Sequence, residues 1–172
     1  MKQNDFAESM LKGRMAETLF EGLMKDSGNK VYRFGYEAIT QNLVQLGESF
    51  DKYGEVSEKI RAIPDFIVID KKGKPQFVEV KFRWEPNEPL YDQSVGILNR
   101  VAKYWNAPVV FMNCWEQPFF RVSVPPYFDK NKRLIYKPIT SISEWSIEQK
   151  IYNKYENLIH KYLTPTLVPP KK

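Results

Sequence analysis

Two β-prone segments, 63–69 and 75–84, constrain the fold of this chain more than any other feature. The first reads Ile-Pro-Asp-Phe-Ile-Val-Ile and the second reads Pro-Gln-Phe-Val-Glu-Val-Lys-Phe-Arg-Trp. Between them lies the polar stretch 70–74, Asp-Lys-Lys-Gly-Lys, which suits a turn of about five residues. The pattern therefore predicts a β-hairpin whose strands are rich in Val, Ile and Phe, as in the centre of a sheet.

The register of this hairpin predicts a cluster of charges on one face. If Ile69 pairs with Pro75, Asp65 lies opposite Glu79, and Lys81 follows on the same face because strand side chains alternate. Two opposed carboxylates repel each other unless a cation lies between them, and hard divalent cations prefer carboxylate oxygens. A lysine can orient an attacking water or stabilise charge on a phosphate. The alternative is an ordinary cross-strand salt bridge on an exposed face, which the apolar surroundings disfavour.

A helix is predicted over residues 4–26, and it carries a glutamate in an unusual place. On a helical projection Glu17 falls between Phe20 and Met10 and close to Met24, inside the apolar arc. Its carboxylate should therefore point at the core or at a site within it. The alternative is a partly buried glutamate that pairs with a core lysine or arginine, and the helix alone favours neither interpretation.

The rest of the pattern alternates helices with strands, which is typical of an α/β fold with a mixed sheet. We expect strands at 30–36, 108–114 and 119–124, helices at 37–46, 91–105 and 143–163, a loop at 47–59, and a proline-rich connector at 125–138. The length predicts one domain over residues 1–163, followed by a loose C-terminal tail at 164–172. The aromatic stripe of the last helix suits either a homodimer interface or closure of the core.

Composition narrows the class of partner and the compartment. The net charge of +5 favours a polyanionic partner such as nucleic acid, without distinguishing DNA from RNA. The single cysteine, Cys114, excludes an intrachain disulfide and a cysteine zinc cluster. No apolar run approaches membrane-spanning length, so we expect a cytoplasmic protein that does not enter the membrane.

Several basic and aromatic side chains are candidates for nucleic-acid contacts. Trp84, beside the turn at 85–89, is the best candidate for stacking on a base, and Gln93 begins the helix that follows. The basic candidates for phosphate contacts are Arg61, Arg83, Lys130, Lys132 and Arg133. For the last three, a solvated basic surface is an equal alternative.

Taken in order, the charged residues resemble a known family, the PD-(D/E)xK nuclease superfamily. They are most similar to its Holliday-junction-resolvase-like group, over about residues 12–83. There, a helix with a glycine and a glutamate precedes a strand, then Pro-Asp, then Glu-x-Lys. The matching motifs are Gly13-Arg-Met-Ala-Glu17, Pro64-Asp65 and Glu79-Val80-Lys81.

The resemblance implies a restriction-endonuclease-like core, with a central mixed sheet of four to five strands flanked by helices. It implies that Asp65 and Glu79 ligate Mg²⁺ or Mn²⁺ together with the backbone carbonyl of Val80. Lys81 would orient or activate a water, and Glu17 would contact the metal directly or through water. The implied activity is metal-dependent hydrolysis of DNA phosphodiester bonds, with branched or junction DNA as one substrate class.

The chain also departs from the group's pattern. Roughly two dozen residues, 37–63, separate the first strand from Pro-Asp, where the group has a short link. The helix after the core lacks the Gln-x-x-x-Tyr signature of the exonuclease branch, because Gln93 is followed by Ile97. The sequence therefore supports the nuclease core more strongly than junction specificity. The alternatives are a non-catalytic nucleic-acid-binding or assembly protein that retains this core, and an unrelated α/β interaction domain.

Overall fold

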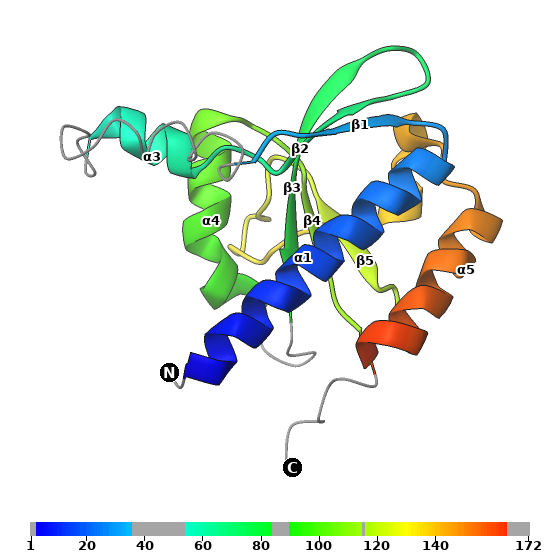
Figure 1. Cartoon of the computed structure of the whole chain (residues 1–172). Helices are drawn as coiled ribbons and strands as arrows, with labels where there is room; N and C mark the ends of the chain where they lie inside the picture. The colour runs from blue at the N-terminus through cyan, green and yellow to red at the C-terminus, as the bar shows by residue number, and fades with distance from the viewer. Residues whose placement is uncertain (1–2, 36–53, 84–89, 115, 165–172) are drawn as a thin grey trace, which may run out of the picture.

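The computed structural model describes residues 3–35, 54–83, 90–114 and 116–164; the side chains of residues 3–9, 61 and 90–94 lie outside the described set. It shows an α/β architecture around one mixed sheet, with α1 crossing in front of the strands (Figure 1). The strands are β1 (Lys30–Arg33), β2 (Phe66–Ile69), β3 (Pro75–Phe82), β4 (Val109–Met112), β5 (Phe120–Ser123) and β6 (Lys137–Pro138). The helices are α1 (Gln3–Asp26), α3 (Glu55–Arg61), α4 (Leu90–Tyr104) and α5 (Gln149–Leu158).

The six strands lie in the order β1-β2-β3-β4-β5-β6. β1, β2 and β3 form an antiparallel meander, α4 crosses over to make β4 parallel to β3, and β5 and β6 return antiparallel. Ile69 pairs with Pro75, so the predicted hairpin register is confirmed. The expected four to five strands were too few, because the two residues of β6, inside the predicted connector, pair with β5.

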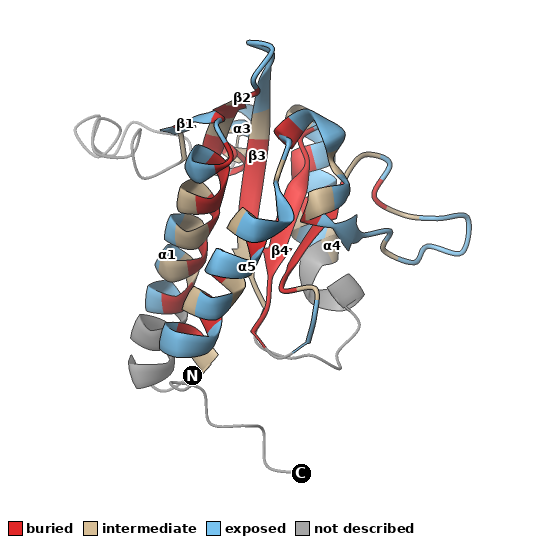
Figure 2. Cartoon of the chain, turned by 90° about the vertical axis from the view of Figure 1, so that its right-hand side faces the viewer, coloured by how far each residue is buried: buried red, intermediate tan, exposed pale blue. Residues whose placement is uncertain are grey.

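Apolar side chains pack on both faces of the sheet. On the α1 and α5 side, Phe20, Phe66 and Val80 belong to the larger cluster of buried residues. On the other side, Leu98 of α4 packs with Phe111 of β4 in a smaller cluster. Figure 2 shows β3 and β4 buried between these layers, with the outer faces of α1 and α5 exposed. Both faces of the central strands are therefore covered, as their near-continuous apolar sequences require.

The last helix closes the core, in agreement with one of the two roles expected for it. Tyr155 and Ile159 are buried against the larger cluster. The helix begins later than residue 143, because a 3-10 turn at Ser143–Trp145 ends at Ser146, whose φ of 49° lies in the left-handed region. The chain continues beyond α5 as a short π-helical segment, Ile159–Leu163.

One predicted loop was partly wrong, and two predicted segments lie in whole or in part outside the described residues. The loop predicted at 47–59 was wrong in its last part, because α3 occupies Glu55–Arg61 and has acidic residues in its first turn, where the helix dipole favours them. The helix predicted at 37–46 and residues 165–172 of the tail lie outside the described residues. Within the described chain, no helix combines the length and the apolar character needed to span a membrane.

Candidate active site

The candidate site lies where β2 and β3 separate. Their ladder ends at the pair Phe66 and Val78. Asp65 directly precedes β2 and lies just outside this ladder. The Oδ2 atom of Asp65 accepts a hydrogen bond of 2.8 Å from the backbone N–H of Val80. Its carbonyl oxygen accepts a 2.8 Å hydrogen bond from the N–H of Phe34, directly after β1. Asp65 is therefore held from both neighbouring strands, and its carboxylate is fixed at the mouth of the hairpin.

Glu79 and Lys81 complete a compact charged cluster with Asp65, as the register predicted. The Nζ atom of Lys81 lies 2.6 Å from Oε1 of Glu79 and 3.9 Å from Oδ2 of Asp65. The side chain of Glu79 is only 8% exposed, and among the described residues its Oε2 atom has no hydrogen-bond partner. A buried carboxylate oxygen without a partner is costly, and natural proteins rarely leave one without a functional reason.

The electrostatics of this cluster follow from its burial. Burial raises the pKa of Glu79 to about 7; the Asp65 carboxylate adds to this effect, while the Lys81 ammonium opposes it. For Lys81, burial alone would lower the pKa, but attraction to Glu79 and Asp65 outweighs burial and raises it. The lysine therefore stays charged at neutral pH, while the glutamate sits near the midpoint of its titration.

Glu17 approaches the cluster from α1, but it is paired with an arginine. Its Oε2 atom lies 3.0 Å from Nη1 of Arg33, and the Nε atom of Arg33 donates to Glu21 at 2.8 Å. Burial raises the pKa of Glu17, and Asp65 raises it further, while Arg33 and Lys81 lower it. Both interpretations of Glu17 thus hold in part, because it pairs with an arginine and also lies within the field of Asp65 and Lys81.

Arg33 is a residue that the sequence analysis missed. Its guanidinium lies 5.4 Å from the ring centroid of Phe66 and bridges two glutamates of α1. Its place in the chain held a weak signal, because it lies two residues after the buried Val31 and therefore shares the strand face that packs against α1. Its partners are 12 and 16 residues away on another element, which no local pattern identifies.

The backbone of Val80 is directed toward the same opening. In a strand, the N–H and the carbonyl of one residue point to the same neighbour, and the N–H of Val80 points at Asp65. The next residue back, Glu79, donates its N–H the other way, to Pro108 before β4. The carbonyl of Val80 is therefore aimed at the opening beside Asp65, as its expected part in a metal site requires.

The residues present fit a divalent cation. Among the described residues, no three His, Cys, Asp or Glu side chains gather into a metal site by themselves, so the protein would supply two carboxylates and a main-chain carbonyl. The unpartnered Oε2 of Glu79, beside the carboxylate of Asp65, offers oxygen donors of the kind that Mg²⁺ and Mn²⁺ prefer. Since Glu17 is bound to Arg33, its predicted contact with a metal fits the route through water better.

The predicted nucleic-acid contacts are only partly within the described structure. Arg83 follows Lys81 on the same strand face, and its guanidinium lies 5.7 Å from the ring centroid of Phe111. Burial lowers the pKa of Arg83. Trp84 and the side chains of Arg61 and Gln93 lie outside the described residues.

The other basic candidates lie on a different part of the sheet. Lys130, Lys132 and Arg133 are exposed on the loop between β5 and β6, at the opposite edge from β1. Asp129 shapes this loop by accepting the N–H of Arg133 at 2.8 Å. The structure therefore places these three residues beside each other but does not join them to the cluster around Asp65.

Comparison of this chain with protein-family models, with curated proteins and with solved structures finds no match in any of the three.

Proposed function

We propose that this protein is a divalent-metal-dependent nuclease that hydrolyses DNA phosphodiester bonds. The observation that carries the proposal is the buried Oε2 atom of Glu79, which lacks a hydrogen-bond partner among the described residues. Among the described residues, the carboxylates of Glu79 and Asp65 share one ion-paired lysine, so the cluster retains negative charge that a cation would neutralise. Perturbed titratable groups of this kind gather at functional sites.

The order of the elements supports a restriction-endonuclease-like core of the PD-(D/E)xK type as part of this proposal. Helix α1 carries Glu17, β2 begins directly after Pro64-Asp65, and β3 carries Glu79-Val80-Lys81. Helices pack against both faces of the mixed sheet. The cytoplasmic location, the homodimer and the choice among duplex, branched and single-stranded DNA remain predictions from the sequence.

The residues of the chain have separable tasks in such a reaction. A bound Mg²⁺ or Mn²⁺ would supply Lewis-acid polarisation of the phosphodiester and counter-charge for the two carboxylates. Lys81, anchored to Glu79 at 2.6 Å, holds a permanent positive charge where it can orient a water and stabilise charge on the phosphate. The bond from Val80 to Asp65 fixes one carboxylate oxygen, and the arginine bond fixes Glu17.

One observation favours the non-catalytic alternative, a nucleic-acid-binding protein that keeps this core. Lys81 already neutralises Glu79, and Arg33 already neutralises Glu17, so much of the charge is compensated within the chain. A protein that only binds nucleic acid needs no bound metal ion, so carboxylates whose charge is compensated within the chain would suffice for it. The two functions differ in whether bonds are cut.

The deciding experiment is cleavage of labelled single-stranded, duplex, flap and four-way-junction DNA in Mg²⁺ or Mn²⁺. We expect metal-dependent cutting by the wild type and its loss in Asp65→Ala. Asp26→Ala, which removes an aspartate that pairs with Lys154 and accepts a hydrogen bond from Tyr155 between α1 and α5, is the matched control and should cut normally. Binding without cutting of any substrate would select the non-catalytic alternative, and neither binding nor cutting would reject both.

A further inference from the structure

The strand face that carries Asp65 and Glu79 extends past the packed rings of Phe34, Phe77 and Trp105 to an exposed surface at the β1 edge of the sheet. Because side chains alternate, the register places Ile67 and Ile69 of β2 on the same face as Asp65. Tyr32 of β1 pairs with Ile67, and Lys30 pairs with Ile69. We call the surface formed by Lys30, Tyr32, Ile67 and Ile69 the open sheet face.

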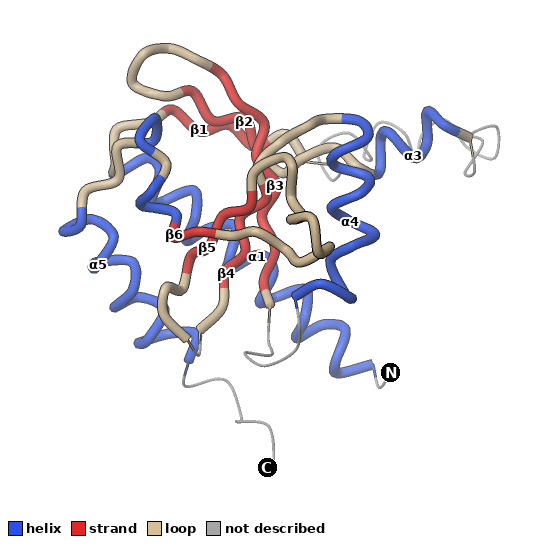
Figure 3. Tube along the Cα trace, turned by 180° about the vertical axis from the view of Figure 1, so that it is seen from behind, coloured by secondary structure: helices blue, strands red, loops and turns tan. Residues whose placement is uncertain are grey.

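The open sheet face is accessible where the rest of the sheet is covered. Tyr32 is 53% exposed, Lys30 is exposed, and Ile67 and Ile69 are half-buried. Viewed from behind, α4 lies to one side of β1 and β2 (Figure 3). An exposed tyrosine on an edge strand, next to a lysine, contributes little to the core and is suited to contact a ligand.

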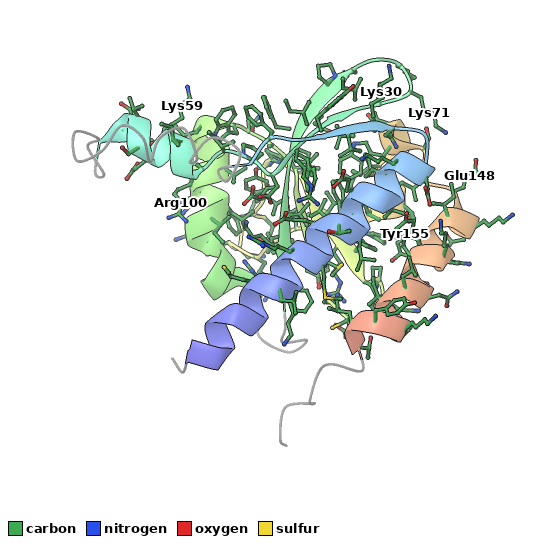
Figure 4. All side chains as sticks on the ribbon, viewed as in Figure 1. Lys30, Lys59, Lys71, Arg100, Glu148 and Tyr155 are labelled. Carbon is green, nitrogen blue, oxygen red and sulfur yellow. The ribbon has the colours of Figure 1, made fainter. Side chains whose placement is uncertain are left out.

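The turn of the β2–β3 hairpin adds positive charge at the far end of this surface. Asp70 accepts the backbone N–H groups of Lys72 and Lys74 at 2.8 and 2.9 Å, which fixes the turn. The side chains of Lys71 and Lys72, which we call the hairpin-tip lysines, are exposed around it, whereas Lys74 lines a pocket with Trp145 on the other face of the sheet. Figure 4 shows Lys30 and Lys71 together at this end of the molecule, away from Tyr155 on α5.

We propose that the open sheet face and the hairpin-tip lysines bind a single-stranded segment of the nucleic-acid substrate, with a base stacked on Tyr32. This inference rests on the proposed function and names the substrate form that this site holds. Phosphates of the segment contact Lys30 and the hairpin-tip lysines, and the strand passes over the packed rings of Phe34 and Phe77 to reach Asp65 and Glu79.

The spacing of the strands suits this arrangement. Two residues along a strand span about 6.6 Å, which we take as one step. Tyr32 pairs with Ile67 and so lies about one step along the sheet from Asp65, and Lys30 pairs with Ile69 and lies about two steps away. One step equals roughly two nucleotides of a stacked strand at about 3.4 Å each. An aromatic ring offers stacking to any base, but only to a base that is not enclosed in a duplex, and lysines track the backbone.

The first test is equilibrium binding of a fluorescein-labelled single-stranded oligonucleotide and its duplex, measured by fluorescence anisotropy in Ca²⁺. We expect Tyr32→Ala to weaken single-strand binding about tenfold, from the loss of one stacked base, with a smaller effect on duplex. Tyr32→Phe keeps the ring and should bind like the wild type. Tyr162→Ala is the matched control, because Tyr162 on the far side of the protein is also 53% exposed.

The second test is the salt dependence of the same binding. Lys71→Gln combined with Lys72→Gln removes two phosphate contacts, so the slope of log K against log salt should become shallower by about 1.4 for a single strand. Lys150→Gln combined with Lys161→Gln, two exposed lysines of the C-terminal helical region, should leave the slope unchanged. Melting curves of each variant check that it folds.

Each outcome separates this inference from the nuclease proposal. Unchanged single-strand binding by Tyr32→Ala, an equal loss in Tyr162→Ala, an equal loss on duplex, or no binding by the wild type overturns the inference. Cutting by the wild type with unchanged binding by Tyr32→Ala keeps the nuclease and rejects this surface. Selective loss of single-strand binding by Tyr32→Ala in a protein that cuts no substrate keeps the surface and rejects the nuclease.

Discussion

Two glutamate–lysine pairs in this protein have the same nitrogen–oxygen distance and different electrostatic character. The Nζ atom of Lys25 lies 2.6 Å from Glu21 on α1, and the Nζ atom of Lys81 lies 2.6 Å from Glu79 on β3. For Glu21, hydrogen bonds and charge from Lys25 and Arg33 outweigh burial and lower the pKa. For Glu79, burial outweighs its single lysine and raises the pKa to about 7. The bond length alone therefore does not say what an ion pair does.

The surroundings explain the difference. Lys25 is 52% exposed and Glu21 also binds Arg33, so water and a second cation stabilise the surface pair. Glu79 is 8% exposed and shares its lysine with Asp65. Buried charges of this kind do little for stability on balance, which is a reason to look for their role in chemistry. Substitutions in each pair test this contrast.

Removing the lysine should slow DNA cleavage for the buried pair and not for the exposed pair. We expect Lys81→Met to lower the rate of DNA cleavage by about 10³-fold, because a positive charge close to the reacting phosphate is lost. Lys25→Met should cut at nearly the wild-type rate, since its pair is exposed. Single-turnover cleavage of the best substrate measures both. Similar rates in the two variants would refute the contrast.

Removing the glutamate from each pair should change the pH dependence of stability with opposite signs. The folded-state pKa of Glu79 is raised, so the fold binds more protons than the unfolded chain between about pH 4.5 and 7. Without divalent metal, the free energy of unfolding should fall as pH rises through this window, by up to about 3 kcal/mol at 1.36 kcal/mol per pKa unit. Glu79→Gln should remove this fall.

The surface glutamate supplies the control for this measurement. The pKa of Glu21 is lowered, so its contribution to stability is present above the unfolded pKa and is lost as the pH falls through the folded value. Glu21→Gln should therefore flatten only the acid side of the curve, with a smaller effect. Urea unfolding at a series of pH values in EDTA measures both variants. A fall with rising pH that persists in Glu79→Gln would assign it to another group.

Divalent metal should stabilise the buried pair and leave the surface pair unaffected. At ten times its Kd, a cation that binds only the folded state adds about 1.4 kcal/mol. The rise in Tm should be larger at pH 8 than at pH 5.5, because Glu79 must lose its proton to bind the cation. Asp65→Asn should abolish the Mg²⁺ effect and Glu21→Gln should retain it. An equal Mg²⁺ effect in both would place the cation elsewhere.

The smallest effect is expected for Arg33, which joins the surface glutamate to Glu17. Its side chain is 49% exposed, so Arg33→Gln should cost only about 1 kcal/mol of unfolding free energy. Because Arg33 lowers the pKa of Glu17, that pKa should rise further in the variant. Urea unfolding and titration of the Glu17 carboxyl by NMR measure the two changes. A loss of several kcal/mol would show that Arg33 belongs to the core instead.

The hairpin and the charges on its face follow from the sequence alone. The alternation of side chains and the length of the turn are local properties, so the pairing of Ile69 with Pro75 and the meeting of Asp65, Glu79 and Lys81 followed from them. The helix of α1 and the α/β class followed from periodicity in the same way.

How each of these charges behaves depends on contacts between elements that are distant in the sequence. The bond from Glu17 to Arg33 joins a helix to a strand, and the extent to which Glu79 is buried depends on both layers around the sheet. The exposure of Tyr32 depends on which strand lies at the edge of the sheet. Position along the chain sets which side chains share a face, but desolvation and partners come from elements distant in sequence, so pKa values and open surfaces appear only after packing.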